Sequence, residues 1–127
     1  MNRLLTPLAI ALGGSLGALA RHAINLLSAR LLGRAFPYGT LFINLTGSFV
    51  LGYFASRVAR GSRLPEPVQL AVTVGFLGAY TTFSTFMFES DAFLRTGLPL
   101  RAAAYLLLSL ALGLASVRLG VIAGQWF

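Results

Sequence analysis

The sequence contains no cysteine and no lysine, a single histidine (His22) and only three acidic residues. The absence of cysteine excludes a disulfide framework and any thiolate metal site. A lone histidine excludes a metal centre built from several histidines of one chain. The carboxylates of Glu66, Glu89 and Asp91 are too few, and too close to the ends of apolar runs, to form a catalytic pair deep in a membrane. Since no nucleophile and base are arranged for catalysis, an enzyme is the least favoured class of function.

Charge is also scarce in this chain. Charged residues make up 10% of the sequence and hydrophobic residues 57%, whereas soluble domains average about 25% charged residues. This composition is typical of an integral membrane protein. The formal net charge of +7 comes entirely from arginines, which fall singly between apolar runs. That spacing favours contact with membrane lipid headgroups over binding to nucleic acid.

Four apolar runs are each long enough to cross a hydrocarbon core of about 30 Å as a helix. We therefore expect an all-α membrane protein with four transmembrane helices, in a single domain that covers residues 1–127. The expected spans are approximately residues 4–32, 38–58, 67–95 and 99–125. Glycines recur along every run, and such small-residue faces let helices approach closely in lipid.

The third run is poor helix material at its centre. Residues 75–86 combine glycines, hydroxyl residues and aromatic rings where leucine, isoleucine and valine would be expected. Backbone polar groups in a bilayer must be satisfied internally, so a broken helix is tolerated only where protein buries it or water reaches it. The sequence thus predicts that the third helix is broken at mid-membrane and that the break marks an ion or substrate site.

Neutral donors in the spans are the candidate ligands, and each has a structural alternative. The amide of Asn44 can donate to a passing anion, or it can form a hydrogen bond between helices. Phe83 and Phe86 are three residues apart and can share a helix face, where their electropositive ring edges can meet an anion; the alternative is ordinary packing. The hydroxyls of Ser84 and Thr85 lie beside them, although such hydroxyls often bond to their own helix.

A break at residues 78–81 can leave backbone carbonyls free, and free carbonyls are good ligands for a hard monovalent cation. The alternative is a kink that Thr81 or Thr82 heals. Glu89 and Asp91 can gate a path or relay protons, but interfacial and solvated positions are favoured for both. Arg21 can attract anions into a vestibule or bind lipid phosphate, and both possibilities stay open.

Arginines are divided evenly between the two sides of the expected bundle. One side holds Arg3, Arg57, Arg60 and Arg63, with Arg118 as a possible fifth, and the other holds Arg30, Arg34, Arg95 and Arg101. Orientation normally follows an excess of Lys and Arg on the cytoplasmic side. The balance leaves two possibilities open, insertion in both orientations or a weak bias that other factors resolve. A chain this short does not easily enclose a pathway alone, which favours a dimer.

The sequence resembles the Fluc (CrcB) family of small fluoride channels over essentially its whole length. The most specific motif behind this resemblance is Thr-Thr-Phe-Ser-Thr-Phe at residues 81–86, preceded by Gly-Phe-Leu-Gly at residues 75–78. Supporting stretches are residues 39–47 around Asn44 and the Gly-x-x-Gly-Ala-x-x-Arg pattern at residues 14–21.

The resemblance implies an antiparallel dual-topology homodimer with two pores in the bacterial cytoplasmic (inner) membrane. Such a channel would export fluoride passively and so prevent fluoride toxicity. The fluoride pathway would comprise Asn44, Phe83, Phe86, Thr40, Ser84, Thr85, Tyr105 and Ser109. Arg21 and Glu89 would lie at the vestibule of the pathway, with Glu89 near the row of polar side chains called the polar track. The carbonyls of Gly78 and Thr81 from both subunits would hold a structural Na⁺ at the dimer interface. This chain departs from the family where Gly113 stands in place of a further hydroxyl after Ser109.

Two other functions compete with a fluoride channel. A small proton-coupled drug exporter also uses four helices, but it needs a carboxylate embedded in the membrane, and the three carboxylates here lie at span ends. A non-transporting assembly subunit would conduct no ions alone and would co-purify with a larger partner.

Overall fold

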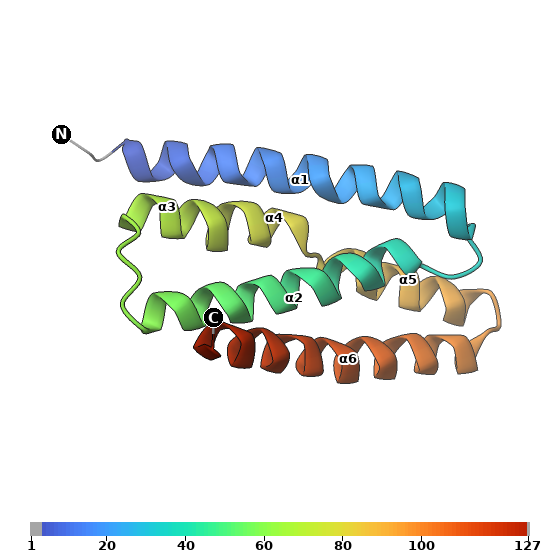
Figure 1. Ribbon diagram of the computed structural model, residues 1–127. Coiled ribbons are helices and arrows are strands. Elements are labelled where there is room, and N and C mark those ends of the chain that lie inside the picture. The colour runs from blue at the N-terminus through green and yellow to red at the C-terminus, as the bar shows by residue number, and fades with distance from the viewer. Residues whose placement is uncertain (1–3, 127) are drawn as a thin grey trace.

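A computed structural model describes residues 4–126; residues 1–3 and 127 lie outside the described part. The described part is helical apart from short connections, and it forms four antiparallel spans (Figure 1). The elements are α1 (Leu5–Leu32), α2 (Tyr38–Ala59), α3 (Glu66–Leu70), η1 (Ala71–Leu77), α4 (Gly78–Tyr80), α5 (Phe83–Arg95) and α6 (Pro99–Trp126). The start of α1, the connection between α2 and α3 and the end of α6 lie toward the same end of the bundle.

The four spans contain 28, 22, 30 and 28 residues and are apolar enough to cross a membrane. At about 1.5 Å per residue, a helix needs roughly 20 residues to cross the hydrocarbon core. Many large apolar side chains point outward, among them Leu107 and Leu110, as a surface that faces lipid requires. The expectation of four transmembrane helices is therefore confirmed.

Glycines let α1 pack against η1 backbone to backbone. A Cβ atom at Gly17 would overlap the carbonyl oxygen of Phe76, and one at Gly13 would overlap that of Ala71. Gly75 faces α1 from the other side and is buried. Because lipid tails are as apolar as leucine, close van der Waals packing of this kind is what holds helices together in a bilayer. The small-residue face expected in the first span is thus the contact with the third.

A second glycine contact joins α2 to α6. A Cβ atom at Gly52 would overlap the carbonyl oxygen of Val117, and one at Gly120 would overlap that of Phe49. Gly124 extends the contact toward the end of α6. The bundle therefore has two tightly packed helix pairs, α1 with the first half of the third span and α2 with α6. The second half of the third span, α5, packs against α6.

The third span changes form three times along its length. After α3 it widens into the π-helix η1, returns to a single α-turn in α4, and stops after Tyr80. Thr81 (φ −78°, ψ 160°) and Thr82 (φ −152°, ψ 122°) are extended, and α5 begins at Phe83. Figure 1 shows α5 stepping away from the line of α3 and α4. The broken third helix predicted from the sequence is confirmed, and we call residues 81–82 the break.

Arginines gather at both ends of the bundle. Arg57, Arg60 and Arg63 lie at the end of α2 and in the connection that follows it, whereas Arg34 and Arg101 lie near the opposite end. Arg3, which the sequence-based balance also counts, lies outside the described residues. The orientation of the chain in a membrane stays a prediction.

Candidate functional site

Asn44 on α2 bonds both backbone groups of Thr82 in the break. Its Nδ2 group donates to the carbonyl oxygen of Thr82 at 3.0 Å, and its Oδ1 atom accepts from the N–H of Thr82 at 2.9 Å. Asn44 is half-buried in an apolar span, and an amide withdrawn from water needs hydrogen bonds to offset the cost. The bond between helices that the sequence left as the alternative for Asn44 is therefore present, and it uses one of the two Nδ2 protons.

Thr82 also caps the new helix. Its Oγ1 atom accepts from the N–H of Thr85 at 3.2 Å, and its hydroxyl proton goes to Oγ1 of Thr85 at 3.1 Å. Threonine is a favoured N-cap because its side-chain oxygen satisfies an N–H group that the first helical turn leaves unpaired. On the other side of the break, Oγ1 of Thr81 donates to the carbonyl oxygen of Leu77 at 2.9 Å. The side chains of both threonines thus form hydrogen bonds with backbone groups next to the break.

Because of these bonds, the N–H groups of Thr82 and Thr85 do not donate to the carbonyls that they would bond in a continuous α-helix. Uninterrupted i→i−4 bonding would pair the N–H of Thr82 with the carbonyl of Gly78, and the N–H of Thr85 with the carbonyl of Thr81. Instead these two donors bond Asn44 and Oγ1 of Thr82. The carbonyls of Gly78 and Thr81 therefore lose their regular helical partners. Among residues 4–126 no group of three His, Cys, Asp or Glu side chains is placed to hold a metal ion.

A hollow of about 280 Å³ lies beside the break, and we call it the break hollow. It is lined by residues of α2, η1, α4, α5 and the break. They are Asn44, Gly47, Ser48, Leu51, Thr73, Leu77, Gly78, Thr81, Thr82, Phe83 and Phe86. The structure thus brings together at one hollow the predicted amide, both predicted rings and both residues whose carbonyls were predicted to bind a cation.

The two phenylalanines of α5 differ in exposure. Phe86 is 5% exposed, whereas Phe83 is 72% exposed, although the ring centroids are 6.2 Å apart in an edge-to-face arrangement. Phe86 also meets Tyr105 of α6 edge to face at 4.9 Å. Phe86 is therefore held in the core of the single chain, while Phe83 projects from it.

A polar network lies on the other side of Phe86. The two carboxylate oxygens of Glu89 accept from the hydroxyls of Thr40 at 2.8 Å and Tyr105 at 2.7 Å. Thr40 and Tyr105 are almost completely buried, and the Oγ atom of Ser109, one turn further along α6, is buried without a hydrogen-bond partner in residues 4–126. Glu89 is thus engaged by α2 and α6, which differs from the solvated position favoured by the sequence.

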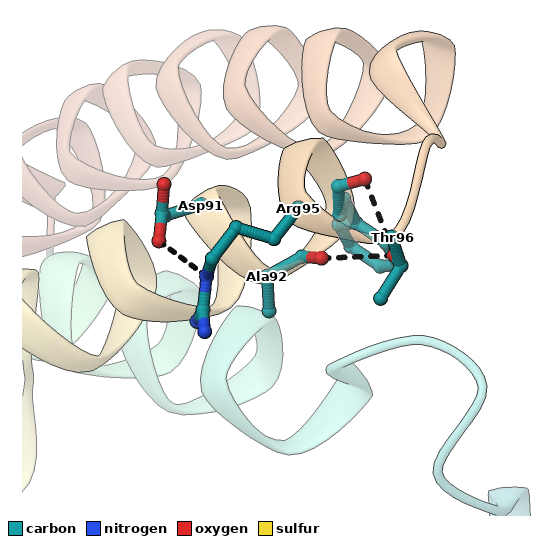
Figure 2. A network of polar contacts seen from close by, with 5 residues as sticks. Asp91, Ala92, Arg95 and Thr96 are labelled. Carbon is teal, nitrogen blue, oxygen red and sulfur yellow. Dashed lines mark hydrogen bonds and ion pairs between the residues drawn. The ribbon is translucent and has the colours of Figure 1, made fainter.

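Asp91 fits the interfacial expectation better. It pairs with Arg95 at 2.7 Å across one turn of α5, and the two side chains are 59% and 57% exposed. Figure 2 shows this pair at the end of α5, with the Thr96 hydroxyl turned back to the carbonyl of Ala92. Exposed pairs of this kind contribute little to stability.

A second hollow of about 620 Å³ opens between α1, α5 and the connection before α2, and we call it the mouth hollow. Thr40 and Glu89 line it together with His22, Arg34 and Arg101. Arg21 does not line either hollow, and neither do Ser84, Thr85, Tyr105 and Ser109. Of the two predicted vestibule residues, Glu89 borders the mouth hollow, whereas Arg21 is half-buried on α1 and does not line it.

The family described as "CrcB-like protein, Camphor Resistance (CrcB)" matches residues 8–121. The chain belongs to the CrcB family. A relative from Nitrobacter hamburgensis, named fluoride-specific ion channel FluC 1, is 44% identical over 114 residues, which cover 90% of each chain. A relative from Chloroflexus aurantiacus, named fluoride-specific ion channel FluC, is 44% identical over 120 residues, or 94% of this chain and 95% of the relative.

A longer CrcB relative from Methylococcus capsulatus, also named fluoride-specific ion channel FluC, is 48% identical over 118 residues. The match covers 93% of this chain but 52% of that relative. Membership of the CrcB family and four helices of membrane length identify a multi-pass bacterial membrane protein.

One pair of residues at this CrcB site was not found from the sequence. Tyr80, the last residue of α4, is 7% exposed, and its hydroxyl lies 2.8 Å from Oγ1 of Thr46 on α2. The two residues are 34 positions apart, and nothing in their spacing indicates that they meet. The sequence does show that Thr46 and Tyr80 are polar residues within apolar runs, but this does not indicate that they bond each other.

Proposed function

We propose that this chain is a fluoride-selective channel that lets fluoride leave the cell passively. The observation that carries the proposal is that relatives matching at least nine-tenths of both chains are named fluoride-specific ion channels. Since these relatives are named as channels, the chain is not an enzyme. Passive exit across the bacterial cytoplasmic membrane would keep fluoride from accumulating to toxic levels.

The chemistry of the break hollow supports this ion. Fluoride is small and strongly hydrated, so a path must replace its water with donors that do not hold it too tightly. Asn44 has a second amide proton beyond the one given to Thr82. Thr85 does not line the hollow, but its hydroxyl accepts from Thr82, which does, and so keeps its own proton for another acceptor. Edges of the Phe83 and Phe86 rings add weak positive charge.

One face of α2 supports a path between the two hollows. Thr40, Asn44 and Ser48 follow one another at intervals of four residues, which places them along one side of the helix. Thr40 lines the mouth hollow, whereas Asn44 and Ser48 line the break hollow. Between these levels Phe86 contacts Tyr105, whose hydroxyl bonds Glu89. Fluoride would pass along this face and through the polar network. There the exposed Ser84 adds a donor, as does the hydroxyl of Ser109, which has no partner within residues 4–126.

An inverted second copy would complete the path and give the dimer two pores. Phe83 is exposed beside a hollow that the single chain leaves open, and a partner surface would shield both from lipid. The even division of arginines between the two ends is compatible with insertion in both orientations. Because the chain has no cysteine, a Ser62→Cys variant carries one thiol in the connection after α2. An impermeant maleimide should label roughly half of these thiols in intact vesicles, whereas complete or absent labelling would exclude dual topology.

The carbonyls of Gly78 and Thr81 are the proposed ligands of a structural Na⁺ between the two copies. The donor set fits, because both carbonyls lose their regular helical partners at the break and hard cations prefer neutral oxygen ligands. A bound cation would supply positive charge that holds the two broken helices together. The residues of this chain would fix the directions of the oxygens.

Fluoride release from liposomes tests the proposal. Purified protein is reconstituted into vesicles loaded with fluoride or chloride, and ion-selective electrodes record release when a potassium ionophore balances the charge. Rapid release of fluoride without an added energy source is expected, with release of chloride close to that of protein-free vesicles. No release of fluoride would refute the proposal. Proton-driven export of a lipophilic cation would instead favour a drug exporter.

A further inference from the structure

One turn of α2 contacts three successive residues of the third span. Asn44 bonds Thr82, and Thr46 bonds Tyr80. Between these bonds the methyl group of Thr81 lies against Gly47, where a Cβ atom would overlap it. The residue whose carbonyl is the proposed cation ligand is therefore fastened to α2 on both sides.

The hydrogen bond between Tyr80 and Thr46 has a defined direction. Thr46 Oγ1 lies 2.8 Å from the carbonyl oxygen of Phe42 in its own helix, so the single hydroxyl proton of Thr46 is used there. The Tyr80 hydroxyl must then donate to Thr46. Its ring is stacked on Phe76, with the centroids 5.7 Å apart and the planes at 16°. Packing holds the ring, and the hydroxyl fastens its end to α2.

We infer that Tyr80 and Thr46 are positioning residues that set the direction of the Thr81 carbonyl and thereby the affinity of the break for its cation. The inference rests on the proposed function, because it takes the Na⁺ site as given. Tyr80 ends the helical turn that begins at Gly78, and the backbone is extended from Thr81. A rotation of Tyr80 would thus turn the carbonyl of Thr81 relative to that of Gly78. Neither Tyr80 nor Thr46 has to touch the ion for this effect.

The test measures thermal stability of the purified protein while Na⁺ replaces a large organic cation at constant ionic strength. Tyr80→Phe keeps the stacked ring and removes the hydroxyl, and Thr46→Val removes the acceptor at almost constant volume. Each variant should raise the half-saturating Na⁺ concentration by roughly threefold to tenfold, the effect of losing one hydrogen bond. The double variant should be no worse than either single one, and Thr46→Ser should restore the wild-type value.

Thr73→Val is the matched control, because Thr73 lies beside Gly78 and Thr81 at the break hollow but its hydroxyl donates to the carbonyl of Gln69 in its own helix. It should leave the half-saturating concentration unchanged. If Tyr80→Phe or Thr46→Val lowers stability equally at all Na⁺ concentrations, the pair is merely structural and the inference is wrong. If either variant fails to fold, the other decides the question alone. A wild-type protein without any response to Na⁺ would instead refute the proposed cation site, whatever the variants do.

Discussion

Replacing Asn44 with leucine should destabilise the protein by disconnecting α2 from the break. Leucine keeps the branched shape and the number of heavy atoms of asparagine, although its methyl groups are bulkier, and both hydrogen bonds to Thr82 are lost. Thr82 is only 8% exposed, so its N–H and carbonyl cannot turn to bulk water. An unsatisfied buried group costs about 1–3 kcal/mol in soluble proteins, whereas double-mutant cycles in a membrane protein average about 0.6 kcal/mol per hydrogen bond. For the two groups of Thr82, the expected loss is therefore about 1 to 6 kcal/mol.

The loss can be measured as the change in the unfolding midpoint in mixed detergent micelles. Protein concentration must be held constant, because the stability of the proposed dimer would depend on it. Ser48→Ala is the matched control, since it removes a polar group from the same hollow without affecting either bond to Thr82. Asn44→Leu should unfold earlier than both the wild type and this control. If Asn44→Leu unfolds at the wild-type midpoint, the amide does not hold the break and the account of the site is wrong.

Three further predictions concern single side chains. Phe83→Ile should slow fluoride release by roughly threefold to tenfold through loss of a ring edge. Phe88 is a similarly exposed ring on the same helix outside both hollows, so Phe88→Ile should release fluoride at the wild-type rate. Equal rates in all three proteins would show that the Phe83 ring does not line the path. Tyr105→Phe removes a 2.7 Å hydrogen bond from the polar network and should slow release by roughly fivefold, and an unchanged electrode trace would argue that the network lies off the path. Gly120→Ala should destabilise the bundle by about 1–3 kcal/mol in thermal unfolding, because the added Cβ overlaps a backbone carbonyl of α2. Gly113→Ala should be neutral or stabilising, because the added atom meets nothing. If Gly113→Ala were the less stable of the two variants, the described packing of α2 against α6 would be contradicted.

The four helices and the break could be predicted because the bilayer restricts the options. Uninterrupted apolar runs of this length have few alternatives to a spanning helix. Glycines and hydroxyls concentrated at residues 75–86 then indicate where one helix fails. The widened turns of η1 could not be predicted in this way, because they accompany the close approach of Gly75 to α1, which is a contact between distant segments.

The partners of the candidate residues depend on tertiary contacts as well. Asn44 was recognised as a polar group that needs a partner, but its pairing with Thr82 joins positions 38 residues apart. Helical spacing placed Phe83 and Phe86 on one face, yet it could not indicate that α6 buries only the second ring. Glu89 lies near the end of an apolar run, so the sequence favoured solvent; the hydroxyls of two other helices engage it instead.

The reversal potential of a bilayer containing the protein tests the central claim most directly. With fluoride on one side and chloride on the other, a path built from neutral donors and ring edges should pass fluoride almost alone. The account predicts a reversal potential that follows the fluoride gradient and does not change when the chloride concentration is varied. A reversal potential that depends equally on the chloride and fluoride concentrations would contradict the account.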